Sequence, residues 1–236
     1  AAGMQSLIEK YVNDDVIQTI AAEYGKGRTL LIGTTNLDVG RPVIWNIGEI
    51  ATIGSKASRE LVRDVILASA SIPGLFPPVM IEVEAGGQRY DEMHVDGGVS
   101  RQVFLFPAAM MWNKLITELG YSGEQTLYVI RNSNMINDPQ VVKRKFLSVA
   151  MRSINILSTN QGIGDLYQLY LIATNNDIGF NLAFIPPDFK EESLELFDSQ
   201  YMQKLFELGV QIGSTNDHWQ QYPPGFSQTP EQEPSD

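Results

Sequence analysis

Strand-like and helical segments alternate along this chain, and the alternation limits the fold more than any other feature. Short apolar, β-branched runs bounded by turn residues predict strands, whereas apolar residues three and four positions apart predict helices. Strands are expected at residues 30–34, 41–47, 79–83, 88–95, 126–131 and 182–185. Helices are expected at residues 4–12, 14–24, 58–71, 107–119, 139–175 and 198–212. The pattern indicates an α/β architecture of layered helices and sheet, because a bundle or a β-sandwich would lack the alternation.

Particular residues are expected to begin or interrupt these elements. Asp14 and Ser58 have the side chains that favour a helix N-cap, and Gly162 and Gly164 predict a break in the long helix. The pairs 30–34 with 41–47 and 79–83 with 88–95 are separated by short turn sequences, so each pair predicts a β-hairpin.

Composition excludes several classes of function. The 236 residues contain 17 Lys and Arg against 28 Asp and Glu, a net charge of −11, which argues against a general role in binding nucleic acid. Cysteine is absent, which excludes disulfides, thiolate zinc sites, iron–sulfur clusters and a cysteine nucleophile. The longest apolar run, residues 103–112, contains Pro107 and is shorter than the roughly 20 residues that a membrane-spanning helix needs.

The length suits one large domain or two tightly joined ones, of which we expect the single domain, followed by a tail. A chain with 43% hydrophobic residues can build one large core, which we expect within residues 1–219. Residues 220–236 are rich in Pro and Gln and predict a disordered tail. The first residues enter a helical pattern with no leader or capping sequence before it, so we expect the chain to begin inside a domain.

The most informative candidate for chemistry is Asp96, in the segment Met93-His94-Val95-Asp96-Gly97-Gly98-Val99. A carboxylate at the end of an apolar strand is well placed to act as a base, and two glycines let the backbone turn or approach a neighbour closely. The Asp-Gly pair is also one of the strongest turn signals, and this segment by itself favours the turn. Both interpretations stay open at this point.

A second candidate is the segment 67–78, in which a helix end of small residues leads into a rigid, proline-rich apolar turn. Small residues either pack closely or line a cleft, and the composition favours a stiff connection packed on the core. The segment contains Ser69 and Ser71, which lie just before the turn.

Histidines and basic residues are few. His218 adjoins the polar tail and is expected to be solvated, whereas His94 lies on the same strand face as Asp96 and more often serves as a structural partner than as a catalyst. The basic cluster Lys143-Arg144-Lys145 with Arg152 favours a solvated helix face over a contact with anionic lipid. No glycine-rich phosphate-binding motif and no G-x-S-x-G motif occurs in the chain.

Several segments, taken together, resemble the patatin-like phospholipase family, specifically its bacterial members. The resemblance extends over most of Leu7 to Gly213 and rests on the residue ranges 26–38, 41–48, 68–79, 90–98 and 197–209. It implies a three-layer α/β fold, with a central and mostly parallel sheet flanked by helices. It also implies a serine–aspartate dyad with no histidine, which acts on lipid or acyl esters without a cofactor or a metal ion.

The resemblance places Asp96 as the family's catalytic aspartate and gives no substrate-binding residue. Asp96 would accept the serine proton and later activate water on the acyl-enzyme. In the family, the G-x-S-x-G serine and the glycine-rich oxyanion loop come before the point where this chain starts. We therefore expect the N-terminal strands to be missing and the chain to supply only the aspartate, without activity of its own. The resemblance slightly favours the cell envelope or secretion, which the residues do not decide.

Three explanations for the missing nucleophile remain. The chain is a shortened protein, one half of an enzyme whose companion chain carries the serine, or a noncatalytic lipid-binding or interaction module that keeps the fold. Exposed sheet edges would then favour a companion chain or self-association. A less usual interpretation uses Ser69 or Ser71 as a new nucleophile near Asp96.

Overall fold

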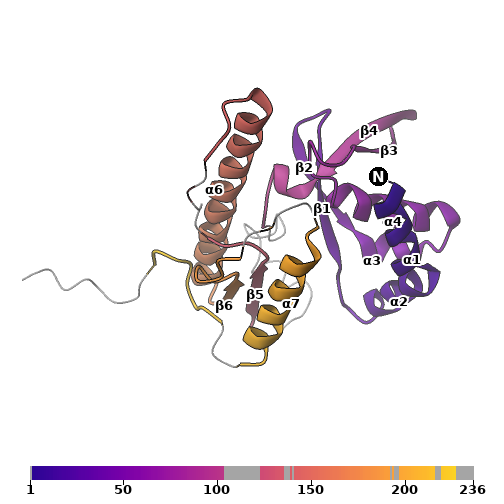
Figure 1. Cartoon of the computed structure of the whole chain (residues 1–236). Coiled ribbons are helices and arrows are strands. Elements are labelled where there is room, and N and C mark those ends of the chain that lie inside the picture. Colours follow the sequence, from indigo (N-terminus) through magenta and orange to yellow (C-terminus); the bar gives the residue numbers. More distant parts are fainter. Residues whose placement is uncertain are drawn as a thin grey trace, which may run out of the picture. The chain divides into compact units, whose positions relative to one another are not determined.

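A computed structural model describes residues 2–103, 123–135, 139, 141–191, 193, 197–215 and 219–226. The chain forms two compact units, Ala1–Gln102 and Val103–Asp236, called here the N-terminal and the C-terminal unit. Both contain helices and strands (Figure 1), so the predicted α/β class is confirmed.

The sheet of the N-terminal unit has four strands in the order β2-β1-β4-β3 and is antiparallel throughout. Its strands are β1 (Leu31–Asn36), β2 (Arg41–Asn46), β3 (Val79–Ala85) and β4 (Gln88–Asp96). The two predicted hairpins are confirmed as β1–β2 and β3–β4. Because short turns allow only antiparallel pairing, these hairpins exclude the mostly parallel sheet that the resemblance implied for this part of the chain.

Four helices complete the N-terminal unit: α1 (Ala2–Tyr11), α2 (Asp14–Tyr24), α3 (Ile47–Thr52) and α4 (Lys56–Ser69). Helix α4 contacts β1, β3 and β4, and α2 and α3 pack beside it. The core between these elements comprises Ile17, Ile47, Ala51, Val62, Val65, Ala68 and Ile81.

The capping residues of two helices differ from those expected. Asn13, not Asp14, caps α2, because its side chain accepts a hydrogen bond from the Val16 amide. Ser55, not Ser58, caps α4 in the same way, by accepting a hydrogen bond from the Ser58 amide. Acidic and hydroxyl residues also fit the first helical turn, so several neighbours satisfied the sequence pattern and only the backbone path distinguished them. Helix α3 was not predicted.

In the C-terminal unit, β5 (Thr126–Arg131) and β6 (Gly179–Phe184) pair in parallel. Helix α6 (Phe146–Asn175) connects them, as a parallel pair requires, and α7 (Ser199–Gly213) follows. The core of this unit comprises Val129, Met135, Leu166, Leu169, Ala173, Ile178, Phe180 and Leu182. The expected parallel pairing is therefore found here and not in the larger sheet.

Helix α6 corrects the prediction of a broken helical region. It begins at Phe146, later than expected, and continues through Gly162 and Gly164 without interruption. Glycine costs only about 1 kcal/mol in a helix, and the burial of Leu166, Leu169 and Ala173 on the same helix outweighs that cost.

The beginning of the expected disordered tail is packed. Gln220 bridges to Leu182 of β6, the Tyr167 hydroxyl donates to the Pro224 carbonyl at 2.7 Å, and the Phe226 ring contacts the Tyr167 ring. Aromatic and proline side chains give this segment apolar surface to bury, which its polar composition obscured. Residues 227–236 and the helix expected at 107–119 lie outside the described residues.

No helix in the described parts of the chain has both the length and the apolar character that are needed to cross a membrane.

Candidate functional site

Asp96 is the last residue of β4, at the point where β4 lies beside β1. Its amide donates to the Ser71 carbonyl at 3.0 Å, and its carbonyl accepts the Thr35 hydroxyl at 3.0 Å. The turn that follows α4 and the strand β1 are thus both tied to the backbone of Asp96. This bonding fixes the main chain on which the carboxylate stands.

Among the described residues, the Asp96 carboxylate accepts a hydrogen bond at one of its two oxygens. Its Oδ1 accepts the Gly98 amide at 2.6 Å and so caps the short 3-10 turn Gly97–Val99. No described residue donates a hydrogen bond to its Oδ2. Partial burial raises the pKa of the Asp96 carboxyl, and the Gly98 hydrogen bond opposes this rise. A raised pKa makes a carboxylate a stronger proton acceptor, so the carboxylate has the basicity of a general base.

Gly97 allows the strand end to approach β1 closely. A Cβ atom on Gly97 would lie 2.6 Å from the Gly33 carbonyl oxygen and 2.9 Å from the Gly33 carbonyl carbon. The Thr35 hydroxyl oxygen lies 2.8 Å from that of Ser100, which closes the turn on its other side. The Asp-Gly-Gly sequence therefore forms the turn that one of the two interpretations predicted, with the carboxylate positioned by it.

His94 is fully buried in a polar network beside this turn. Trp45 Nε1 donates to Thr34 Oγ1 at 2.8 Å, Thr34 Oγ1 lies 2.9 Å from His94 Nδ1, and His94 Nε2 lies 3.3 Å from Glu92 Oε2. Because an indole N–H can only donate, Thr34 Oγ1 accepts from Trp45, and its second contact is with His94 Nδ1. Both ring nitrogens are engaged, so the geometry supports a structural role. His218 lies outside the described residues.

Ser69 and Ser71 are poorly arranged for nucleophilic chemistry. The Ser71 hydroxyl is buried and donates to the Leu67 carbonyl at 2.8 Å, and the Ser69 hydroxyl donates to the Ile66 carbonyl at 2.8 Å. A serine nucleophile needs its proton directed at a base. Both of these protons are directed at helix carbonyls, so neither serine is paired with the Asp96 carboxylate.

The sequence did not identify the threonines that support the site. Thr34 and Thr35 are almost fully buried in β1, where they serve His94 and the Asp96 turn respectively. Two adjacent hydroxyl residues inside an apolar strand were the available signal, since buried hydroxyls need partners. Strand propensity alone explained them equally well, because threonine is β-branched.

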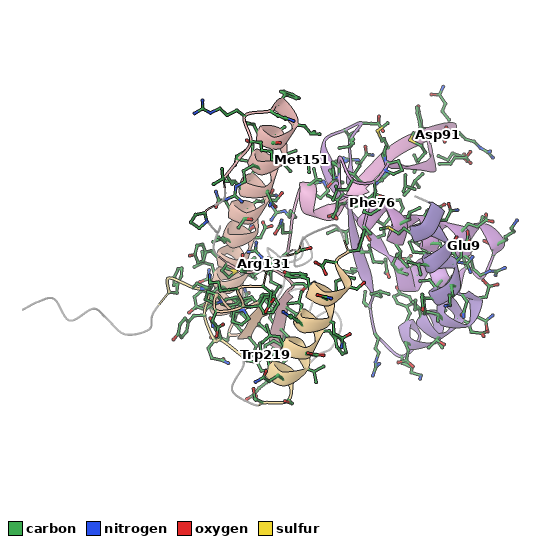
Figure 2. All side chains as sticks on the ribbon, in the orientation of Figure 1. Glu9, Phe76, Asp91, Arg131, Met151 and Trp219 are labelled. Atoms are coloured by element: carbon green, nitrogen blue, oxygen red, sulfur yellow. The ribbon has the colours of Figure 1, made fainter. Side chains whose placement is uncertain are left out.

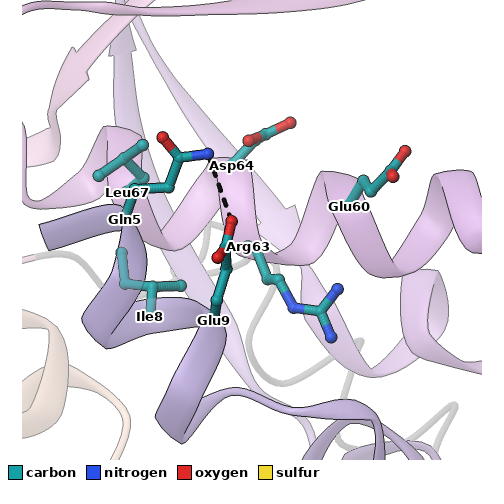
Figure 3. A pocket seen from close by; sticks show the side chains of 7 residues that line it. All are labelled: Gln5, Ile8, Glu9, Glu60, Arg63, Asp64 and Leu67. Atoms are coloured by element: carbon teal, nitrogen blue, oxygen red, sulfur yellow. Dashed lines mark hydrogen bonds between the residues drawn. The ribbon is translucent and has the colours of Figure 1, made fainter. Parts of the chain in front are cut away.

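A pocket of 510 Å³ lies between α1 and α4, away from Asp96, and includes three carboxylates (Figure 3). Burial and the neighbouring Glu60 raise the pKa of Asp64, while Gln5 donates to Glu9 at 3.4 Å. Within the described part of the chain, no group of three His, Asp or Glu side chains is placed to hold a metal ion. The pocket is lined by Gln5, Ile8, Glu9, Glu60, Arg63, Asp64 and Leu67.

The C-terminal unit has its own buried polar centre at Arg131 (Figure 2). Arg131 Nε donates to Ser133 Oγ at 2.7 Å, and its Nη2 donates to the Thr159 carbonyl at 3.4 Å. Burial lowers the pKa of the Arg131 guanidinium, and the buried Asp165 opposes that change. Arginine stays charged in such a setting, so this centre anchors the end of β5 to α6.

Replacing Asp96 with Asn is expected to raise the thermal midpoint of the N-terminal unit at pH 7. Burial raises the pKa of Asp96 in the folded protein, so the ionised carboxylate costs stability above that pKa and the cost disappears as pH falls through it. The advantage of Asn should therefore shrink as the pH is lowered. Thermal unfolding of both proteins over a pH series measures the difference.

The control for this substitution is Asp91→Asn, on the exposed part of the same strand (Figure 2), which should change stability by less than about 0.5 kcal/mol. An advantage of the Asp96→Asn variant that grew toward low pH would contradict the assigned role of burial.

Residues 3–109 match the family model described as Patatin-like phospholipase. Comparison with curated proteins and with solved structures gave no match. The match includes Asp96 and nearly all of the N-terminal unit, and it ends before the resemblance noted at residues 197–209, which stays a prediction. Over residues 3–109, this chain is therefore similar to patatin-like phospholipases.

Proposed function

We propose that this chain is part of a lipid acyl hydrolase in which Asp96 is the general base and a serine outside these 236 residues is the nucleophile. The carrying observation is the half-buried Asp96 carboxylate at the end of β4, with Oδ1 fixed by Gly98 and Oδ2 not bonded by any described residue. The three-layer fold of the family, completed by strands from outside the chain, is part of the same proposal.

In the proposed reaction, Asp96 Oδ2 takes the serine proton as the serine oxygen bonds to the ester carbonyl carbon. The carbonyl electrons move to oxygen and return as the alcohol leaves, and Asp96 returns the proton to that alcohol. Water then attacks the acyl carbon while Asp96 accepts the water proton. The fatty acid is released as Asp96 returns that proton to the serine oxygen. The raised pKa of Asp96 supports each proton transfer to it.

The chain by itself is expected to be inactive. Acyl transfer needs a nucleophile and stabilisation of the oxyanion as well as a base, and the chain contains no G-x-S-x-G motif. Loss of the nucleophile from such a catalytic unit typically lowers the rate by roughly a millionfold. The hydroxyls of Ser69 and Ser71 are bonded to helix carbonyls and do not offer a substitute.

A fluorophosphonate probe, which bonds covalently to activated serines, tests the proposal. The probe is applied to the natural protein source, followed by capture of this chain with whatever is attached to it and intact mass of every polypeptide. We expect the label on a longer form or on a companion chain that carries G-x-S-x-G, and none on the isolated 236 residues. Asp96→Asn should abolish labelling, whereas Asp91→Asn should preserve it.

A probe mass on the isolated 236-residue chain would show that the nucleophile has been misplaced, and Ser69→Ala and Ser71→Ala would then locate it. Labelling that Asp96→Asn leaves intact would remove Asp96 from the mechanism.

The second candidate is a noncatalytic lipid-binding or interaction module. One observation favours it: the Asp96 carboxylate already has a structural task, as the cap of the Gly97–Val99 turn, which would retain it without catalysis. The reading frame upstream of Ala1 separates the two candidates, because a G-x-S-x-G there supports the enzyme. If the probe labels no form of the protein, the noncatalytic module is the function that remains.

A further inference from the structure

The first half of α6 presents an apolar face to solvent. Phe146 is 90% exposed, Leu147 69%, Ile154 48% and Leu157 69%. At 3.6 residues per turn these four positions fall within an arc of about 100°. Within the C-terminal unit, this half of the helix extends beyond the β5–β6 sheet (Figure 1), and Met151 marks it in Figure 2.

This face is separate from the one that builds the core. Leu166, Leu169 and Ala173, in the second half of α6, are buried against the sheet and lie on a different side of the helix. The exposed residues therefore contribute nothing to the core of the unit. Several large apolar side chains gathered on one exposed face indicate a surface that contacts a partner.

Basic residues stand immediately before this face. Lys143, Arg144 and Lys145 are exposed, and the next turns add Arg152. From Val141 to Gly164 there is no acidic residue, although the whole chain has a net charge of −11. This region is therefore a local positive pole on an acidic protein, and its charge is complementary to an anionic partner.

We propose that residues 143–157 form a docking surface for an anionic lipid bilayer. Helices that lie in the bilayer interface combine an apolar face, which enters the headgroup and acyl boundary, with basic residues that contact lipid phosphates. Phe146, Leu147 and Leu157 provide the first part and Lys143–Lys145 the second. The negative charge of the rest of the chain does not prevent docking, because salt screens it beyond about 8 Å at physiological ionic strength.

This docking surface does not depend on the proposed function, since it requires neither Asp96 nor a nucleophile. The experiments can distinguish a protein that docks on membranes without hydrolysing esters from a hydrolase that does not bind the bilayer. Vesicle binding reports on the first property and fluorophosphonate labelling on the second.

The test is flotation of the full 236-residue chain with vesicles of phosphatidylcholine, with and without phosphatidylglycerol. We expect binding to the anionic vesicles that weakens in high salt. The combined change Lys143→Gln, Arg144→Gln and Lys145→Gln should weaken the partition coefficient roughly 100-fold. The pair Phe146→Ser and Leu157→Ser should weaken it roughly 10-fold or more.

The matched control is Phe206→Ser, which removes a 70% exposed phenylalanine from α7 and should leave binding unchanged. Circular dichroism confirms that each variant is folded. Equal binding to neutral and anionic vesicles, no binding to either, or equal loss in the Phe206→Ser variant would overturn the proposal. A dimer in size-exclusion chromatography that the paired change at Phe146 and Leu157 dissolves, without vesicle binding, would assign the face to a second copy of the chain instead.

Discussion

Gly97→Ala is expected to destabilise the N-terminal unit by about 3 kcal/mol or more. The added methyl group would lie 2.6 Å from the Gly33 carbonyl oxygen and 2.9 Å from its carbonyl carbon. Both atoms belong to the main chain of β1 and cannot rotate away as a flexible side chain could. Either β1 and β4 separate or the Asp96 turn is displaced, and both changes remove hydrogen bonds.

Hydrogen exchange followed by mass spectrometry measures this effect separately in each unit. Amides of β1 and β4 should exchange much faster in Gly97→Ala, while those of β5 and β6 should keep their protection. The control is Gly164→Ala in α6, where a Cβ meets nothing within 4 Å and alanine should stabilise the helix by up to about 1 kcal/mol. Unchanged exchange in β1 would contradict the close approach at Gly97.

Substitution of His94 by Leu is expected to cost about 2–4 kcal/mol of folding stability. His94 has no exposed surface, and its removal deprives the Thr34 hydroxyl and the Glu92 carboxylate of the hydrogen-bonding partner that they share. Leucine would fill the volume but would leave Thr34 buried without its partner. The loss therefore arises from unsatisfied polar groups more than from an empty cavity.

Urea unfolding measures the change in folding stability. It is monitored by the fluorescence of Trp45, which contacts both His94 and Thr34. The other two tryptophans are replaced by Phe in every variant compared. Glu92→Gln keeps a hydrogen-bonding partner for His94 Nε2 and should cost less than about 1 kcal/mol. Thr34→Val combined with His94→Leu should cost less than the sum of the two single changes, because they break the same hydrogen bond. Strict additivity would mean that the network contributes nothing as a unit.

Elements with a strong local pattern were the predictable part of this fold. Strand β5 was predicted at its observed bounds, both hairpins were found, and Asp198 caps α7 where that helix was expected to begin. Local signals of this kind depend on residues a few positions apart. Helices α6 and α3 show the limit of prediction from local pattern. Helix α6 is unbroken because of the burial of its second half, and α3 forms because of the chain path around Asn46.

The candidate site shows the same division. The sequence singled out Asp96 and its glycines. The structure adds the hydrogen bond from the Gly98 amide to Asp96 Oδ1, the burial that raises the pKa of Asp96, and the hydrogen bond from the Asp96 amide to the Ser71 carbonyl. It also supplies Thr35 and Ser100, whose hydroxyls meet across 65 positions of the chain. No local pattern carries information about contacts of that range.

What the sequence determined by itself is the α/β class, the two hairpins, the resemblance to patatin-like proteins and the position of Asp96, because each depends on residues that are neighbours along the chain. Tertiary structure alone decided that the larger sheet is antiparallel throughout, that His94 is sealed in a hydrogen-bonded network, and that one face of α6 remains exposed. Strand order and burial are set by which distant segments pack together, and that choice depends on the whole core at once.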